Sequence, residues 1–133
     1  MRFMIIVRMT AQMEAGVMPT PEQIEAMGRF NEQMIEAGIL LAGEGLHPSI
    51  KGARIRKEGG RYLVMDGPFS ESKELIGGFW LIQVKDRDEA VAWCLRIPLE
   101  DGEEVELRQV FEVSDLPPDL ANADRVTQRP VGV

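Results

Sequence analysis

The chain has 133 residues, the usual length of a single domain. Its hydrophobic fraction of 44% and charged fraction of 28% are close to globular averages, which excludes a wholly disordered, collagen-like or disulfide-stapled protein. Fifteen lysines and arginines against 22 acidic residues give a formal net charge of −7, which argues against nucleic acid or an anionic membrane as a partner.

Two further features bear on the compartment. The single cysteine, Cys94, excludes an intramolecular disulfide and fits a reducing environment. The apolar run over residues 3–7 is too short for a signal-peptide core or a membrane span. We therefore expect a cytoplasmic protein with no membrane partner.

The first predicted elements are a strand and a helix. Residues 3–7 form a nearly unbroken apolar stretch, as expected of a strand that is covered on both faces. Thr20 and Gln23 have the spacing of a capping box, and apolar residues then recur every three or four positions. This pattern predicts a helix over residues 21–37 that ends at Gly38.

The middle of the chain predicts another strand and then a hairpin. Residues 39–46 read as a strand interrupted by two glycines. Residues 53–57 and 61–66 flank Gly59 and Gly60, a two-residue hairpin turn. That turn sets the register, so two cross-strand pairs are expected, namely Glu58 with Arg61 and Ile55 with Val64.

The C-terminal part of the chain repeats the first pattern. Residues 78–84 predict a strand, and Asp86 begins a second helix that stops before Pro98. Alternating residues over 104–113 predict the last strand. The segment 115–133 contains three prolines and few large apolar residues. After a domain over residues 1–114 we therefore expect either a disordered tail or an arm laid across a neighbouring chain.

The predicted order is strand, helix, strand, hairpin, strand, helix, strand. It corresponds to an α+β, ferredoxin-like βαββαβ sheet with an inserted hairpin and both helices on one face. The other face is predicted to be apolar, and a symmetric partner would cover it, which predicts a homodimer. The residues assigned to that face are Met4, Ile6, Trp80, Ile82 and Val110.

His47 is the first candidate for general acid–base chemistry, because it is the only histidine and imidazole titrates near neutral pH. It lies in the run 43–49, where glycines let backbone approach a ligand. Glu44 and Ser49 in that run are candidates for substrate contact. The alternative, that His47 is an ordinary solvated loop residue, stays open.

The turn over residues 66–69 is the second candidate segment. Asp66 would orient His47 or bind substrate, since a carboxylate beside an imidazole fixes its tautomer, and Phe69 would contact substrate. The alternative is that Asp66 and Gly67 serve only the geometry of the turn.

Arg8 and Arg108 are candidates for holding negative charge on a small polar or anionic substrate, because arginine binds carboxylate and phosphate in a bidentate manner. The alternative for both is an ion pair at a subunit interface. We expect no metal, because one histidine, one cysteine and scattered carboxylates show no ligand spacing. We also expect no cofactor, because no phosphate-binding glycine loop is present.

Residues 66–74 read D-G-P-F-S-E-S-K-E and precede Gly77 and Gly78, which resembles the D-G-P-F signature of the YCII-related family. Segments 43–48 and 106–108 resemble that family too, so the likeness covers residues 1–114. It implies a ferredoxin-like fold that dimerises into an α/β barrel, in bacterial cytoplasmic proteins mostly of unknown function.

The resemblance also implies lyase or dehydrochlorinase chemistry by a His-Asp pair, with the histidine on the first helix and the aspartate after the second. Neither position matches, because residues 21–37 contain no histidine and Pro98 and Leu99 follow the second helix. If a pair exists in this chain, His47 and Asp66 must form it.

Three hypotheses follow. In the first, the chain is a small-molecule enzyme, a proton-transfer lyase or isomerase in which His47 moves a proton and Asp66 orients it. In the second, it is a non-catalytic ligand-binding or regulatory module, as for family relatives associated with sigma factors. In the third, it is a dimer whose D-G-P-F turn is only architectural.

Overall fold

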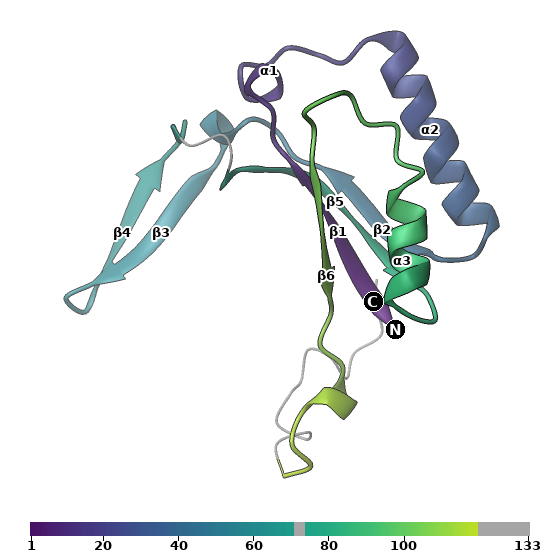
Figure 1. The fold of residues 1–133 in the computed structure, drawn as a ribbon. Helices are drawn as coiled ribbons and strands as arrows, with labels where there is room; N and C mark the ends of the chain where they lie inside the picture. The colour runs from purple at the N-terminus through teal and green to yellow at the C-terminus, as the bar shows by residue number, and fades with distance from the viewer. Residues whose placement is uncertain (71–73, 120–133) are drawn as a thin grey trace.

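The protein is built on one four-stranded antiparallel sheet. The computed structural model describes residues 1–70 and 74–119, and the sheet runs in the order β2-β5-β1-β6 (Figure 1). Every neighbouring pair is antiparallel. The strands are β1 (Arg2–Arg8), β2 (Leu40–Gly45), β5 (Ile76–Gln83) and β6 (Val105–Gln109).

Two helices cover one face of this sheet, α2 (Pro21–Glu36) and α3 (Arg87–Cys94) (Figure 1). The capping box predicted for α2 is present, because the Thr20 hydroxyl accepts from the amide of Gln23 and the Gln23 side chain accepts from the amide of Thr20. The Asp86 carboxylate caps α3 by accepting from the amide of Glu89. The mixed α+β sheet with helices on one face is thus confirmed.

The core lies between the sheet and these helices. Ile5, Met34 and Ile82 are fully buried there. Trp80 packs edge-on against Phe30 of α2, with ring centroids 5.4 Å apart. Burial of these side chains from strands and helices together makes the sheet and its two helices one packed unit.

The placement of Trp80 and Ile82 corrects the sequence prediction, which put both on the open face of the sheet. Trp80 lies opposite Ile5 and Ile82 opposite Phe3, so both point toward the helices. Residues 78–84 are apolar almost without a break, and such a run carries no period of two from which to assign faces. Phe79 and Leu81 occupy the open face instead, opposite Ile6 and Met4.

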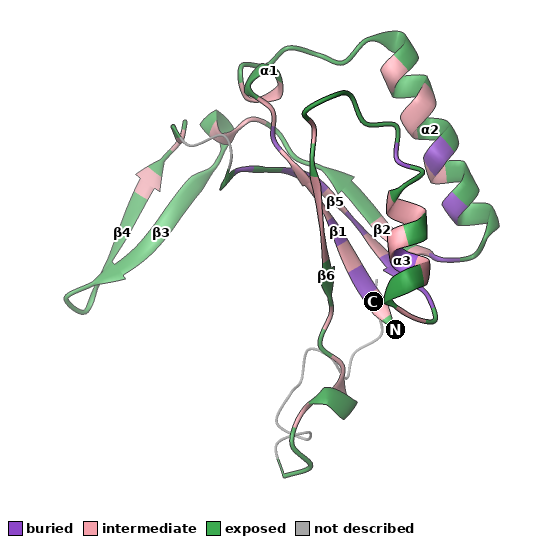
Figure 2. Cartoon of the chain, in the orientation of Figure 1, coloured by how far each residue is buried: buried purple, intermediate pink, exposed green. Residues whose placement is uncertain are grey.

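The hairpin predicted in the middle of the chain is a ribbon of two strands, β3 (Ala53–Glu58) and β4 (Arg61–Asp66). Glu58 pairs with Arg61 and Ile55 with Val64, so the expected register is confirmed. The ribbon projects away from the sheet, and most of it is exposed (Figures 1 and 2). It makes a separate two-stranded sheet.

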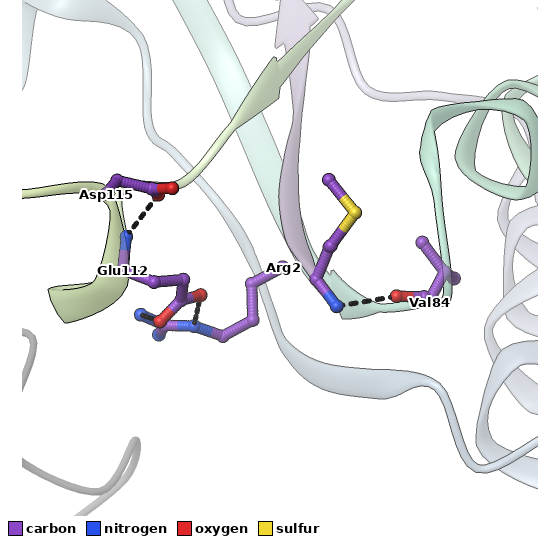
Figure 3. Close-up of polar contacts among 5 residues, drawn as sticks. Arg2, Val84, Glu112 and Asp115 are labelled. Atoms are coloured by element: carbon purple, nitrogen blue, oxygen red, sulfur yellow. Dashed lines mark hydrogen bonds and ion pairs between the residues drawn. The ribbon is translucent and has the colours of Figure 1, made fainter.

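The last strand is shorter than its alternating pattern predicted. It ends at Gln109, and a 3₁₀ turn, η3 (Val113–Asp115), follows it. The amide of Glu112 donates to the Asp115 carboxylate at 2.8 Å, and the Arg2 guanidinium donates to the Glu112 carboxylate at 2.7 Å (Figure 3). The amide of Val110 still donates to the carbonyl of Arg2 in β1 at 3.0 Å, and the contacts of Glu112 hold the chain beyond it.

Some expectations fall beyond the described part of the chain. Residues 71–73 of the D-G-P-F segment and residues 120–133 of the predicted tail lie outside the described residues. Among the helices that the structure does describe, none has the length and apolar character needed to cross a membrane.

Candidate functional site

The loop that carries His47 is held on both sides of the imidazole. The amide of Leu46 donates to the carbonyl of Gly77 at 2.9 Å, which extends the pairing of β2 with β5. The amide of Ser49 donates to the Glu14 carboxylate at 2.7 Å. His47 lies between these two anchored residues and is exposed. The loop therefore presents the imidazole to solvent from a fixed backbone.

Ser49 joins three segments that are far apart in the sequence. Its hydroxyl donates to the carboxylate of Glu14, at the end of the short helix α1 (Ala11–Glu14), and accepts from the amide of Phe69 at 2.9 Å. The hydrogen bonds from the Ser49 hydroxyl and amide lower the pKa of Glu14. We call this cluster the hairpin base, and it consists of Glu14, His47, Ser49, Asp66 and Phe69.

The glycine of the D-G-P-F turn is required by a close backbone approach. A Cβ on Gly67 would lie 1.8 Å from the carbonyl oxygen of Ser49, so no other residue fits without displacing the backbone. The amide of Gly67 also donates to the carbonyl of Gly52 at 3.0 Å. The Arg54 guanidinium lies over the Phe69 ring, 4.1 Å from its centroid. The turn thus locks the ribbon to the His47 loop.

His47 and Asp66 belong to segments that are in contact. Within the described residues, however, no hydrogen bond or ion pair joins their side chains. Asp66 is exposed and lies at the end of β4, opposite Ala53. The His-Asp pair stays a prediction.

A cleft of about 390 Å³ lies between α2 and the ends of β2 and β5. Four glycines line it, and Gly45 is two residues before His47. A Cβ on Gly78 would lie 2.7 Å from the Glu44 carbonyl oxygen, so this glycine lets the two strands approach. The other lining residues are mostly apolar, and Glu44 is the only charged one: Val7, Met27, Asn31, Ile35, Leu40, Glu44, Phe79 and Trp80.

Polar groups in this cleft come from strand and helix alike. The indole nitrogen of Trp80 donates to the Asn31 side-chain oxygen at 2.8 Å, so the ring is fixed against α2. Glu44 lies opposite Phe79, so its exposed carboxylate belongs to the open face of the sheet. The cleft is suited to a small, largely apolar molecule that hydrogen-bonds the Asn31 side chain.

Arg8 and Arg108 lie together on the open face of the sheet. The Glu106 carboxylate bridges them, at 2.5 Å from Arg8 and 3.2 Å from Arg108. Hydrogen bonding from Arg108 and the charges of both arginines lower the pKa of Glu106. The ion pair is formed within one chain, so the charge of each guanidinium is partly compensated by a neighbouring carboxylate.

The single cysteine, Cys94, is partly buried and packs against the core. Burial raises the pKa of its thiol, which favours the protonated, less nucleophilic form. No cluster of three or more potential metal-ligating side chains occurs among the described residues.

Sequence reasoning missed Glu14 and Asn31 as parts of these sites. Glu14 ends a helix of only four residues, which is too short to show a period. Asn31 lies in α2, where its contact with Trp80 depends on which side of the sheet Trp80 takes. Neither residue carried a local signal.

Comparison with known proteins gives three findings. The model of the YCII-related domain matches residues 1–114. An uncharacterised protein of Rhizobium meliloti (strain 1021) is 34% identical over 95 residues, which cover 68% of this chain and 77% of that protein. The solved structure of 5-chloro-2-hydroxyhydroquinone dehydrochlorinase from Burkholderia phenoliruptrix AC1100, in complex with 2,5-dihydroxybenzoquinone, aligns with 12% identity and a TM-score of 0.42 over 84% of this chain and 95% of that chain.

Proposed function

We propose that this chain, which belongs to the YCII-related family through the match over residues 1–114, is a small-molecule enzyme in which His47 transfers a proton. The observation that carries the proposal is the anchored loop of His47. Hydrogen bonds at Leu46 and Ser49 hold the only imidazole of the chain in an exposed position directly after the glycine-lined cleft. Fixed geometry and access to substrate are what general acid–base catalysis needs.

The reaction class is proton transfer in a lyase or isomerase. A neutral imidazole takes a proton from an acidic C–H group of the substrate. In an isomerase it returns the proton to another atom of the substrate. In a lyase the substrate then expels a leaving group, which departs with its bonding electron pair. Asp66, in the adjoining turn, orients the ring in this proposal. Ser49 and Phe69 shape the same surface, and Glu44 binds a donor group of the substrate.

Arg8 and Arg108 lie on the open face of the sheet, so in this proposal they hold negative charge on a substrate that reaches His47 from that face. Their compensation by Glu106 makes them suited to a partial charge that develops during reaction rather than to a full anion in the ground state. The Glu44 carboxylate belongs to the same face, because Glu44 lies opposite Phe79. The expected homodimer would cover the open face that carries these arginines.

The test needs no knowledge of the natural substrate. A panel of small lactones, hydroxy compounds, ketones and carboxylates is incubated with the protein in D₂O, and proton NMR follows the loss of each C–H signal. His47→Gln should slow the exchange of any active compound by about 100-fold or more. Ile50→Gln is the matched control, because Ile50 is 66% exposed in the same loop and carries no proton-transfer group.

The outcome separates the two leading hypotheses. Exchange that His47→Gln leaves unchanged contradicts the proposal. A compound that shifts the signals of Trp80 and Asn31 without exchange in the wild-type chain favours the second candidate, a ligand-binding module. That candidate rests on the cleft itself, whose lining is mostly apolar.

A further inference from the structure

The β3–β4 ribbon has two chemically different faces. Directly paired residues of an antiparallel ladder share a face, so Ile55, Val64 and Tyr62 lie together on one side of the ribbon. That side also carries Lys57, opposite Tyr62, and Asp66, whose formal charges cancel. The opposite side carries Arg54, Arg56 and Arg61 together with Glu58, Leu63 and Met65. One face is therefore mostly apolar with no net charge, and the other has a net charge of +2.

Nothing within the described part of the chain covers the apolar face. Ile55, Val64 and Tyr62 are 65%, 67% and 70% exposed, although the ribbon register places them side by side. A two-stranded hairpin is at best marginally stable alone in water, so a ribbon of this kind needs a surface to pack against. Its own sheet does not provide that surface, because the ribbon points away from it (Figure 1).

Charge indicates what that surface is. Residues 53–66 carry four cationic side chains, Arg54, Arg56, Lys57 and Arg61, against the two carboxylates of Glu58 and Asp66. The ribbon thus has a formal charge of +2 in a chain of −7, which leaves −9 for all the other residues. A second copy of this chain therefore presents an acidic body that attracts the ribbon.

The same chain also has a second uncovered apolar surface. Met4, Ile6, Phe79 and Leu81 share the open face of the four-stranded sheet, at positions where β1 and β5 pair. Glu106, opposite Ile6, borders this face on β6. In a twofold dimer the ribbon of each chain contacts the body of the other, so the same contact between two apolar surfaces forms twice.

We propose that the β3–β4 ribbon is a docking arm that packs its Ile55–Tyr62–Val64 face against the body of a second copy of this chain. The net positive charge of the arm is then brought close to the acidic body of that copy, which favours the association at long range. The hydrogen bonds at Ser49 and Gly67 hold the arm at the angle from which it reaches out. Docking needs neither a ligand nor turnover, so it stands independently of the chemistry proposed for His47.

The test uses the fact that Tyr62 is the only tyrosine of the chain. Full-length protein labelled with 3-fluorotyrosine gives a single ¹⁹F resonance, which is followed in a dilution series beside sedimentation velocity. The resonance should shift in step with the dimer fraction, because docking removes Tyr62 from water. Added salt should lower the dimer fraction through screening of the charge attraction.

Two variants sharpen the result. Ile55→Ser/Val64→Ser should raise the dissociation constant of the dimer by about tenfold or more, because both side chains lie at the centre of the contact. Arg56→Glu/Arg61→Glu should raise it too and flatten its salt dependence. Leu95→Ser, at a position 82% exposed at the end of α3, is the control and should change neither quantity.

Several results would overturn the proposal. The ribbon is not a docking arm if the chain stays monomeric, or if the chain dimerises while the Tyr62 resonance does not move. A resonance that responds to a DNA oligonucleotide and not to protein concentration would assign the ribbon to nucleic acid instead. Circular dichroism of each variant checks that the body is folded. The ¹⁹F dilution series of the wild-type protein tests the docking of the ribbon without any variant.

Discussion

The four-stranded sheet and the β3–β4 ribbon use similar strand residues and reach opposite states of burial. Ile82 in β5 is fully buried between β1 and the helices, whereas Ile55 in β3 is 65% exposed. The difference lies in what packs on each strand rather than in the strand itself. Propensity and alternation make both regions extended, but only the sheet has helices over it.

This comparison teaches where stability and function separate in the molecule. The sheet and its helices hold the packed core and therefore most of the free energy of folding. The ribbon and its base hold the exposed groups, including His47 and the apolar arm. A structural change in one region should accordingly leave the other nearly intact.

The largest expected effect comes from truncating matched isoleucines in the two regions. Ile82→Ala should lower the free energy of unfolding by about 2–5 kcal/mol, because it opens a cavity in the core. Ile55→Ala should lower it by about 0.5 kcal/mol or less, because the side chain is already in water. Urea denaturation followed by tryptophan fluorescence measures both, since Trp80 and Trp93 report on the body.

Repeating the denaturation of both variants at several protein concentrations separates folding from docking. Docking on a second copy would add a concentration-dependent loss for Ile55→Ala, while the loss for Ile82→Ala should persist at every concentration. Equal losses for the two variants at low concentration would contradict the separation, because the ribbon would then belong to the same cooperative core.

A smaller effect is expected where the two regions join. Gly67→Ala should destabilise the protein by about 1–3 kcal/mol, since its Cβ would overlap the carbonyl of Ser49 and must push the two backbones apart. Gly45→Ala is the control, because a Cβ there has no neighbour within 4 Å.

Hydrogen exchange adds a local measurement to the urea curves. The amides of residue 67 and Phe69 should be less protected from exchange in Gly67→Ala, while the protection of the β1 and β5 amides should not change. An unchanged exchange rate at Phe69 would mean that the hairpin base does not depend on the close approach of Gly67 to Ser49.

The sequence predicted most of the fold because its signals were local. The two-residue turn at Gly59–Gly60 determines the ribbon register, and the spacing of Thr20 and Gln23 determines the start of α2. The side of the sheet taken by Trp80 was not predictable, because the surrounding residues are apolar on both faces. That assignment depends on pairing with β1, a contact of long sequence separation.

The candidate site was predictable only in part. The residue types of the His47 loop and the D-G-P-F turn indicated chemistry, and the structure places the two segments in contact through Ser49 and Phe69. The anchoring carboxylate of Glu14 was not predictable, because it comes from 35 residues away in a helix of a single turn.

The smallest expected effect concerns that carboxylate and the pH at which the hairpin base forms. Hydrogen bonds from the Ser49 hydroxyl and amide lower the pKa of Glu14 below its ordinary 4.5. A carboxylate with a depressed pKa stabilises the folded state above its unfolded pKa, and this contribution is lost as pH falls through the lower folded value. The hairpin base should therefore loosen only in acid, below about pH 4.5.

Carbon-detected NMR titration of the Glu14 carboxyl group tests this directly. Ser49→Ala should raise the pKa of Glu14 toward its ordinary value, because the hydroxyl is the largest cause of the shift. Ser70→Ala removes an exposed hydroxyl from the neighbouring turn and should leave the titration of Glu14 as it is in the wild-type chain. If Ser49→Ala leaves the Glu14 titration unchanged, the Ser49 hydroxyl does not hold this carboxylate, and α1 is held to the loop by the Ser49 amide instead.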